Sequence, residues 1–435
     1  MKPKNSQPDE YIFYEKETNM PNPLSDNTIA IVKATVPALE AHGLTITRRM
    51  YERMFKNEEI RDLFNQSHHG ETGSQPKALA DAVLAYARNI ENLSALGGAV
   101  ERIVQKHVAL NILPEHYPFV AEALLGAIGD VLGDAATPDI LAAWGEAYWF
   151  LAEILIGREA TVYRELAAQP GGWNGWRDFV VEQVVDESSI IRSITLVPAD
   201  GGRVMRHKPG QYLGFALNVP GAGALRRNYS ISCGPNDRAY RITVKRETTP
   251  GVQAGAASNW LHDNALPGTV LRATVPAGDF FLDGAPDSPV VLVSGGVGLT
   301  PMVSMLEAIV ATQPRRPTSW VHGALNGRVH AMRDHVRDLA AAAPGVTATT
   351  FYAEPLGGDR PGREFDIQGL ISARWLVEHT PVAGATFYLC GPKPFLRALV
   401  GGLLAENVPE DRIRYEFFGP ADELLTPGGD ALAAD

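Results

Sequence analysis

The sequence predicts a multidomain protein: an all-α domain, then an antiparallel β-barrel domain, then an α/β domain with a parallel sheet. Apolar residues recur at helical spacing up to about residue 168 and alternate with polar residues from about residue 176. Strand and helix patterns alternate from about residue 288, and a glycine-rich turn follows the first of these strands. A chain of 435 residues is long enough for about two to four domains.

The helical pattern covers residues 25–168. Apolar side chains follow one face along 100–108 and again along 144–166. Breaks predicted from glycine, proline and polar clusters divide the region into six or more helices; they fall at 65–73, 114–118 and 133–138. The run from Gln169 to Gly175 is a domain boundary signal.

Alternation with a period of two marks residues 176–284. Tyr240, Ile242 and Val244 lie on one face of a predicted strand, and polar residues lie between them. Six strands are predicted, at 179–185, 190–197, 211–219, 227–233, 239–247 and 269–275, with a short helix near 259–263. Short strands of this number favour a small antiparallel barrel.

Residues 288–420 alternate between strands and helices. The predicted strands are 289–294, 318–323, 347–353, 385–390 and 412–418. This order favours a doubly wound parallel sheet that binds ligands beyond the carboxyl ends of its strands. Residues 1–24 and 421–435 are predicted to be an N-terminal extension and a C-terminal tail outside the domains.

Composition excludes several classes of function. The net charge of −11 and the lack of a basic run argue against nucleic-acid binding. Two cysteines, Cys233 and Cys390, are too few for a disulfide framework, a zinc site or an iron–sulfur cluster, and they suit a reducing cytoplasm. The polar first 24 residues do not form a secretory signal, and the apolar run 147–157 is too short to span a membrane.

The glycine-rich turn after residue 294 is predicted to bind a dinucleotide. Its residues are Gly296, Val297, Gly298, Leu299, Thr300 and Pro301. Glycines allow a ligand to approach the backbone, and the free N–H groups of the following helix attract phosphate; Thr300 is expected to cap that helix and Pro301 to begin it. A tight strand–helix turn without a ligand is the alternative. Tyr388–Pro392 ends another strand, so both turns should open at one edge of the sheet.

The choice between NADH and NADPH stays open. The strand 318–323 does not end in the acidic residue that binds a ribose diol in Rossmann domains. Arg328 lies just past that strand, where it either meets a 2′-phosphate or is a surface arginine.

The barrel contains a second candidate site. Arg227-Asn228-Tyr229-Ser230 places a guanidinium, an aromatic ring and a hydroxyl along one strand, a set that suits a pyrophosphate and a flat heterocycle. An exposed arginine beside a core tyrosine is the alternative. The segment 255–259, which includes Ser258, precedes a short helix and is a further candidate for binding phosphate.

The helical region contains two unusual polar residues, His107 and Glu159, on apolar stripes. His107 is either a hydrogen-bonded core residue or a metal ligand. Glu159 either accepts a hydrogen bond from Tyr117, which would orient His107, or pairs with Arg158 or Arg164 at the surface, because an unpartnered buried carboxylate is costly.

Together these motifs resemble the flavohaemoglobins over residues 25–420. The resemblance implies a globin domain at 25–168, an FAD-binding β-barrel domain at 176–284 and an NAD(P)-binding domain of ferredoxin-reductase type at 288–420. Gln105-Lys106-His107 is similar to the segment with the proximal haem ligand, and Met50–Phe55 to the one whose tyrosine reaches haem-bound oxygen.

Residue roles follow from that resemblance. It implies that His107 is the axial ligand of the haem iron and that Tyr117 and Glu159 hydrogen-bond around it. It implies that Tyr51 reaches haem-bound oxygen, that Phe64 packs on the haem, and that Gln75 and Leu79 occupy distal positions. It implies that Tyr212, Arg227, Asn228, Tyr229, Ser230, Ser258, Phe417, Phe418, Gly419 and Pro420 bind FAD, with Phe418 over the ring. Lys106 and Glu416 look like the charged residues that tune redox potentials. Because Pro76 follows Gln75, Gln75 is expected in or before the first turn of a helix.

The activity implied is that of a nitric oxide dioxygenase. NAD(P)H reduces FAD, FAD passes electrons singly to haem b, and the haem with bound O2 converts nitric oxide to nitrate. The haem is expected to be non-covalent because the chain lacks a CxxCH motif. Two alternatives are a gas sensor or oxygen-binding globin, and a flavin reductase that acts on a soluble acceptor. The protein is expected to be a monomer in the cytoplasm.

Overall fold

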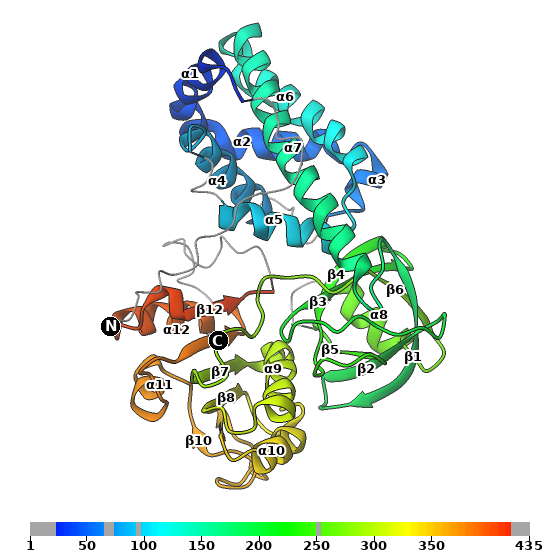
Figure 1. The fold of residues 1–435 in the computed structure, drawn as a ribbon, viewed down its shortest axis with the longest axis vertical. Coiled ribbons are helices and arrows are strands. Elements are labelled where there is room, and N and C mark those ends of the chain that lie inside the picture. Colours follow the sequence, from blue (N-terminus) through cyan, green and yellow to red (C-terminus); the bar gives the residue numbers. More distant parts are fainter. Residues whose placement is uncertain (1–22, 65–73, 93–96, 249–253, 419–435) are drawn as a thin grey trace, which may run out of the picture.

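The structure is a computed structural model that describes residues 23–64, 74–92, 97–248 and 254–418. All but the last two residues of the predicted extension 1–24, and all of the tail 421–435, lie outside these residues. Three domains follow one another along the chain (Figure 1).

The first domain is entirely helical. Its α-helices are α1 (Asp26–Ala34), α2 (Val36–Met54), α3 (Glu58–Arg61), α4 (Ser74–Arg88), α5 (Gly97–Leu110), α6 (Tyr117–Leu132) and α7 (Pro138–Ala168). The predicted break at 114–118 is shorter than expected, because α6 begins at Tyr117 directly after the 3-10 turn Pro114–His116. The break at 133–138 holds a second 3-10 turn, and the break at 65–73 lies outside the described residues.

The apolar composition of helix α7 is explained by its position in the domain. Among the described residues, α7 alone, and α1 with α2 as a bent pair, are long and apolar enough to cross a membrane by length and composition. Yet α7 packs against α1, α5 and α6 and buries Ala147, Leu155 and Val162 in the domain core. Its apolar face therefore serves helix packing.

The second domain is an antiparallel barrel. Its strands are β1 (Arg177–Asp186), β2 (Ile191–Pro198), β3 (Tyr212–Val219), β4 (Gly223–Ser230), β5 (Tyr240–Lys245) and β6 (Val270–Ala273), with helix α8 (Ala256–Asn264). The strand order is β4-β3-β6-β1-β2-β5, and a bridge between Ile231 and Ile242 joins the two outer strands. All six predicted strands are confirmed, although β4 begins and ends earlier than the predicted 227–233.

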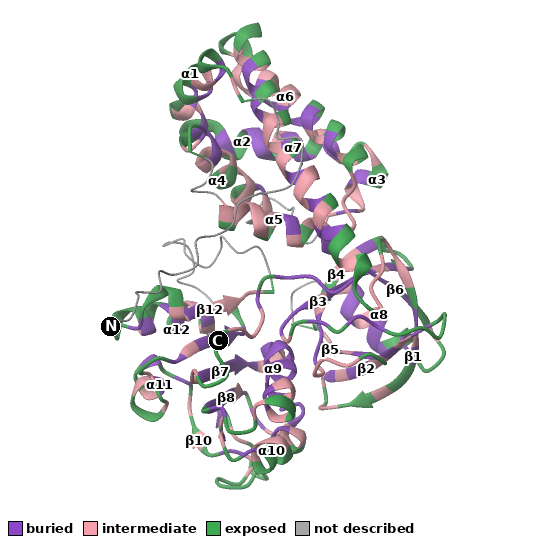
Figure 2. Cartoon of the chain, viewed as in Figure 1, coloured by how far each residue is buried: buried purple, intermediate pink, exposed green. Residues whose placement is uncertain are grey.

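The third domain is a doubly wound parallel sheet. Its strands are β7 (Val290–Gly295), β8 (Thr318–Ala324), β9 (Val346–Tyr352), β10 (Ile367–Gln368), β11 (Thr386–Cys390) and β12 (Ile413–Glu416), and its helices are α9 (Leu299–Thr312), α10 (Arg333–Ala342), α11 (Ala373–His379) and α12 (Lys393–Ala405). The order is β10-β9-β8-β7-β11-β12, with α9 and α10 on one face and α11 and α12 on the other. The central strands are buried on both faces (Figure 2), as parallel strands require.

The glycine-rich turn differs from its prediction in one detail. Residues Gly296–Gly298 form a 3-10 turn, so α9 begins at Leu299 with Gly298 as its N-cap. Thr300 is therefore inside the helix and does not cap it; its hydroxyl donates to Val297 O at 3.2 Å. Pro301 is the third helical residue and not the first. The 3-10 turn starts the helix earlier than the threonine pattern predicts.

The two turns lie at the same edge of the sheet, as predicted, and the structure shows that they are in contact. A Cβ atom at Gly298 would lie 2.2 Å from Cys390 O and 2.7 Å from Gly391 N. Only glycine allows the two backbones to approach this closely.

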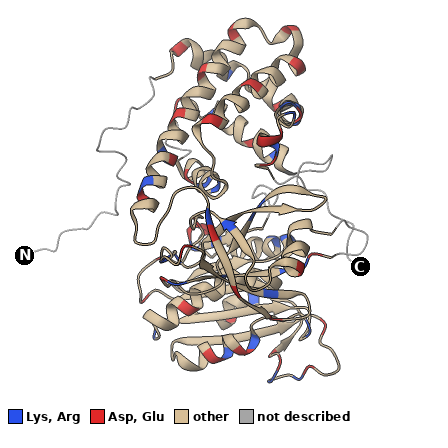
Figure 3. Cartoon of the chain, turned by 90° about the vertical axis from the view of Figure 1, so that its right-hand side faces the viewer, with Lys and Arg blue, Asp and Glu red and all other residues tan. Residues whose placement is uncertain are grey.

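A hydrophobic core joins the first two domains. Val104, Val108 and Ala109 of α5 pack in one buried cluster with Val275 and Ala277 from the segment after β6. Acidic and basic residues are interspersed across the described helices and loops (Figure 3). Apolar packing against Val275 and Ala277 holds α5 on the barrel.

We predict that Gly298→Ala lowers the free energy of unfolding by about 1–3 kcal/mol, because the added methyl group meets rigid backbone. Urea unfolding measures the change. Gly401→Ala in α12 is the matched control; its added methyl group meets nothing within 4 Å, so it should raise stability by about 0.5–1 kcal/mol. A Gly298→Ala variant as stable as the wild type would contradict this packing.

Candidate functional site

His107 lies at the junction of three helices. Its Nδ1 atom is 2.7 Å from Glu159 Oε1 and 3.2 Å from the Tyr117 hydroxyl, which donates to the same carboxylate oxygen at 2.7 Å. Helix α5 supplies the histidine, α6 the tyrosine and α7 the glutamate. Glu159 is only 2% exposed, and these two donors offset the cost of its burial.

The surface alternative for Glu159 is wrong. Arg158 instead binds Glu101, with Nε 2.9 Å from Oε2. Arg164 donates to Ala160 O and to the Thr161 hydroxyl. The sequence could not separate these cases, because one residue along a helix decides whether a side chain faces the core or the solvent.

The tautomer of His107 follows from its partners. A carboxylate only accepts hydrogen bonds, so Nδ1 carries the proton and Nε2 keeps its lone pair. Burial, and then the charge of Glu159, raise the pKa of Tyr117, so its hydroxyl stays protonated as a donor at neutral pH. The imidazole is 29% exposed. It can therefore present Nε2 to a metal as an electron-rich ligand.

A second cluster surrounds Tyr51 on α2. Its ring centroid is 5.5 Å from those of Phe55 and Phe64, and Gln75 hydrogen-bonds to its hydroxyl. Burial raises the pKa of Tyr51, and the Gln75 bond lowers it by less. Gln75 lies in the first turn of α4, where Pro76 was expected to place it, and Leu79 packs against the same cluster.

The two groups of residues meet inside the helical domain. Ile112, Tyr148 and Leu151 pack against both the core around Tyr51 and the core beneath His107. The predicted proximal and distal residues therefore line adjoining parts of one core. A flat, largely apolar group with one axial nitrogen ligand fits this set of side chains.

The barrel residues lie on paired strands. Tyr212 opens β3 opposite Ser230, which ends β4. Arg227 and Tyr229 are half-buried, Asn228 is exposed, and the Tyr229 ring meets Phe215 edge-on. Arg227 donates through Nη1 to the neighbouring carbonyl of residue 226 at 2.7 Å, and it has no carboxylate partner among the described residues.

Ser258 uses its hydroxyl within the protein. It lies in the first turn of α8, donates to Gly255 O at 3.1 Å and accepts from Glu247 N at 3.3 Å. A phosphate would compete with these bonds. The preceding residues 249–253 lie outside the described residues.

Glu416 stands out electrostatically at the end of β12. Burial, followed by the charge of Asp279, raises its pKa from 4.5 to about 7, and the charge of Lys106 opposes this. Lys106 itself is exposed on α5. The positive charge of Lys106 in the helical domain therefore acts on the Glu416 carboxylate at the end of the parallel sheet.

The residues after Glu416 are only partly described. Phe417 packs against the α11–α12 core, and Phe418 is 48% exposed. Gly419 and Pro420 lie outside the described residues.

Sequence analysis missed the contacts that seat α5. Gln105 accepts through Oε1 from Gly278 N at 3.2 Å, and Ala109 O accepts from the Thr274 hydroxyl at 3.1 Å. A Cβ atom at Gly278 would touch the Tyr212 ring at 2.8 Å. Gln105 precedes the predicted axial ligand His107 by two positions, which was the only local signal.

Comparisons with known proteins agree with this division of the chain. Residues 48–155 match the family described as "Globin", and residues 292–400 match "Oxidoreductase NAD-binding domain". Proteins named "Flavohemoprotein" from Xylella fastidiosa and Rhodopirellula baltica are 50% and 47% identical over 401 and 406 residues. Each alignment covers 92% of this chain, and 98% and 99% of the relatives.

Solved structures show the same fold. The flavohaemoglobin from Malassezia yamatoensis, determined with bound FAD and haem, has a TM-score of 0.79 and 26% identity, covering 91% of this chain and 100% of that one. The FAD/NAD-binding domain of nitric oxide dioxygenase from Vibrio cholerae has a TM-score of 0.51 and 35% identity, covering 56% and 99%. The predicted order of an all-α globin domain, a barrel and a parallel-sheet domain is confirmed.

We predict that Glu159→Gln lowers the free energy of unfolding by about 1–3 kcal/mol, because His107 and Tyr117 both donate to Oε1 and a neutral amide oxygen accepts more weakly than a carboxylate. In the haem-loaded protein, the iron–histidine stretching band should move to lower frequency, since the imidazole loses a carboxylate partner. Glu165→Gln, at a residue 62% exposed on the same helix, is the control. An unchanged band would show that Glu159 does not act on His107.

We predict that Glu416→Gln changes how stability depends on pH. The folded protein binds this proton more tightly than the unfolded chain, so the stabilising contribution is complete below about pH 4.5 and is lost as pH rises through about 7. Glutamine does not titrate, so the variant should gain stability relative to the wild type between these values. Urea unfolding across that range, with exposed Glu410→Gln as control, measures it; parallel curves would contradict the shifted pKa.

Proposed function

This chain belongs to the flavohemoprotein family of oxidoreductases, and we propose that it is an NAD(P)H-dependent nitric oxide dioxygenase that converts nitric oxide and O2 to nitrate. Nitric oxide, dioxygen and one electron balance as nitrate. The protein must therefore supply single electrons to the site where the two gases meet. The flavin and haem accepted by this family would provide that conversion, because a flavin takes up a hydride and releases its electrons one at a time.

The observation that carries the proposal is the set of contacts around His107. A carboxylate that is 2% exposed accepts from its Nδ1 atom, and the opposite nitrogen is left to coordinate iron. A carboxylate partner makes imidazole a stronger electron donor, which favours activation of oxygen over its storage. Glu159 and Tyr117 thus hold the ligand in one tautomer and one orientation.

We expect Tyr51 to act on the distal side of the haem, opposite His107. Burial keeps its hydroxyl protonated, and Gln75 holds the hydroxyl in place. The hydroxyl can donate a hydrogen bond to dioxygen, while Phe64 and Leu79 make the surroundings apolar and admit small neutral gases. Water and anions are disfavoured in such a pocket.

The reductase part supplies the electrons. The turn at 296–298 and the N-terminus of α9 suit the pyrophosphate of a nicotinamide dinucleotide. Arg227 on β4 suits the phosphates of FAD, and Tyr212 and Tyr229 suit its flat rings. We also propose a cytoplasmic monomer, in which the free Cys233 and Cys390 stay reduced.

We predict that Tyr51→Phe lowers the rate of nitric oxide consumption about 10–100-fold, which is the effect of losing one strong hydrogen bond to a polarised ligand. Dioxygen should also dissociate faster. Nitrate formation and the oxygen off-rate are the measurements. Tyr86→Phe removes a hydroxyl that donates to Ala147 O in the same domain and is the matched control. If turnover and off-rate both match the wild type, Tyr51 has no such role.

His107→Ala separates the proposal from a flavin reductase. The variant should still oxidise NADH with an artificial acceptor but should not consume nitric oxide. NADH oxidation that is indifferent to both His107→Ala and nitric oxide would instead support a flavin reductase. If the wild type binds these gases but forms no nitrate when NADH is supplied, a sensor or oxygen carrier would be supported.

A further inference from the structure

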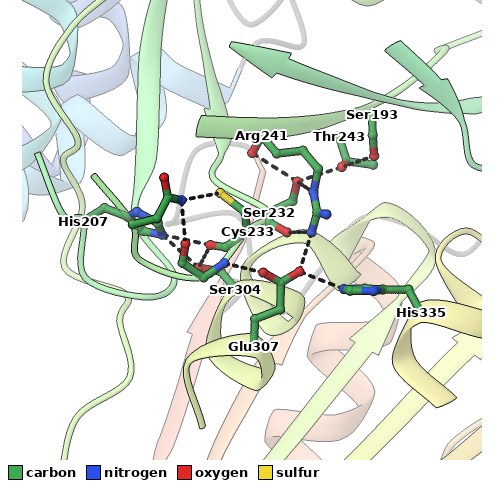
Figure 4. Close-up of polar contacts among 11 residues, drawn as sticks. Ser193, His207, Ser232, Cys233, Arg241, Thr243, Ser304, Glu307 and His335 are labelled. Atoms are coloured by element: carbon green, nitrogen blue, oxygen red, sulfur yellow. Dashed lines mark hydrogen bonds and ion pairs between the residues drawn. The ribbon is translucent and has the colours of Figure 1, made fainter. Parts of the chain in front are cut away.

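A polar network of residues outside the predicted cofactor contacts joins the barrel to the dinucleotide domain (Figure 4). At its centre, the Glu307 carboxylate of α9 accepts from Gly234 N at 2.6 Å, from Arg241 Nη2 at 2.7 Å and from His335 Nε2 at 2.8 Å. Gly234 and Arg241 belong to the barrel, whereas His335 is on α10. One side chain therefore connects three separate segments.

A second contact lies one turn earlier on α9. The hydroxyl of Ser304, which is fully buried, donates to Cys233 O at 2.7 Å. His207 Nε2 donates to the same carbonyl at 3.0 Å and lies 3.1 Å from the serine hydroxyl. Cys233 and Gly234, two successive residues of the loop after β4, are thus held by side chains from successive turns of α9.

The barrel side of the network is itself braced. Arg241 lies on the polar face of β5 and also donates to the backbone oxygen of Ser232. The Thr243 hydroxyl on the same face is within 2.8 Å of the hydroxyls of both Ser193 and Ser232. This face was predicted to be polar. The structure shows that Thr243 on this face is nevertheless buried, and that its hydroxyl is hydrogen-bonded to both serines.

Burial and charge make Glu307 a strong contact. Its side chain is 20% exposed and that of Arg241 is 22% exposed, so solvent screens the pair only in part. Burial alone would raise the pKa of Glu307, but hydrogen bonding from His335 and the charge of Arg241 hold it below its ordinary value. Glu307 is therefore ionised at neutral pH.

Apolar packing does not fill this side of the interface. A cleft of about 290 Å³ lies beside Glu307, lined by Pro209 and Pro235 of the barrel and by Ala308 and Ala311 of α9. Where side chains do not interlock, two domains can shift relative to each other. Their orientation therefore depends on the hydrogen bonds as well as on the apolar contact that Ile191 of β2 makes with the core beneath α9.

The network connects the two segments that are predicted to bind cofactors. Ser232–Gly234 begin two residues after Ser230, the last residue of the flavin strand β4. Ser304 and Glu307 lie within two to three turns of the dinucleotide turn at the start of α9. A movement at the network therefore shifts the nicotinamide site relative to the flavin site.

We propose that Glu307 is a positioning residue for hydride transfer: through Gly234 and Arg241 it fixes helix α9, and the dinucleotide bound at its start, against the flavin strand of the barrel. The proposal rests on the proposed function. Hydride transfer requires the reacting atoms within about 3–3.5 Å, and a misplacement of about 1 Å can cost on the order of 100-fold in rate. Glu307 is not among the residues predicted to bind either cofactor, and it acts through the Gly234 amide and the Arg241 guanidinium.

The test uses the haem- and FAD-loaded protein with Glu307→Gln. An amide cannot accept from donors on both of its sides, so at least one contact is lost. We expect flavin reduction by saturating NADH, followed by anaerobic stopped flow, to slow by about tenfold or more, with a larger isotope effect from NADH deuterated at C4. Electron transfer from photoreduced flavin to haem should be unchanged. The Gly234 amide should exchange hydrogen faster, which is a readout independent of turnover.

Two further variants complete the design. Glu378→Gln removes the same charge from an exposed pair with Arg374 in the dinucleotide domain and is the control. Ser304→Ala removes the second contact; it should slow flavin reduction in the same direction and decides the question if Glu307→Gln does not fold.

The outcomes separate the two proposals. Slow flavin reduction in Glu307→Gln, with normal flavin-to-haem transfer and a normal Glu378→Gln, supports the positioning role. The positioning role is overturned if Glu307→Gln reduces its flavin at the wild-type rate although its Gly234 amide exchanges faster. If Glu307→Gln does not fold, a wild-type rate of flavin reduction in Ser304→Ala overturns it. If neither NADH nor NADPH reduces the flavin of the wild type, the proposed function is wrong, and the positioning role falls with it.

Discussion

The contact between α5 and the barrel is the constraint on which the rest of the structure depends. Ala109 O accepts from Thr274, and a Cβ atom at Gly214 would lie 1.9 Å from that oxygen, so only glycine lets the helix lie this close to β3. His107 is two residues earlier on the same helix, and Tyr212 begins the same strand. The predicted axial ligand and the predicted flavin site are therefore held together by one packed backbone contact, as electron transfer between them requires.

Two carboxylates, the buried Glu159 and the half-buried Glu307, perform similar tasks in different domains. Glu159 and Glu307 each accept several hydrogen bonds, and these bonds offset the desolvation that a buried charge suffers. Glu159 orients a single ring, whereas Glu307 orients a whole domain. In neither case is the carboxylate itself the reacting group. Glu159 holds the His107 ring, and Glu307 holds the helix at whose start the dinucleotide is proposed to bind. In this chain, the orientation of these groups is therefore set by polar side chains whose hydrogen bonds are satisfied within apolar or loosely packed surroundings.

Local patterns predicted most of the fold and part of the site. Alternation located all six barrel strands, but the two-residue strand β10 has no period to detect. The cap assigned to Thr300 was wrong because the glycine turn itself starts the helix. Glu307 lies 66 positions from Arg241 and resembles any residue on a helix surface, so only the packing of two domains reveals the pair. The roles of His107, Tyr51 and the other site residues remain predictions.

The most direct test of the central claim is the absorption spectrum of the purified protein under air, before and after addition of NADH. The account predicts a haem Soret band together with flavin absorption, and a shift of the haem bands after NADH that shows electrons have crossed from the dinucleotide domain to the iron held by His107. A flavin spectrum without haem, or haem bands that do not respond while NADH is oxidised, would contradict it.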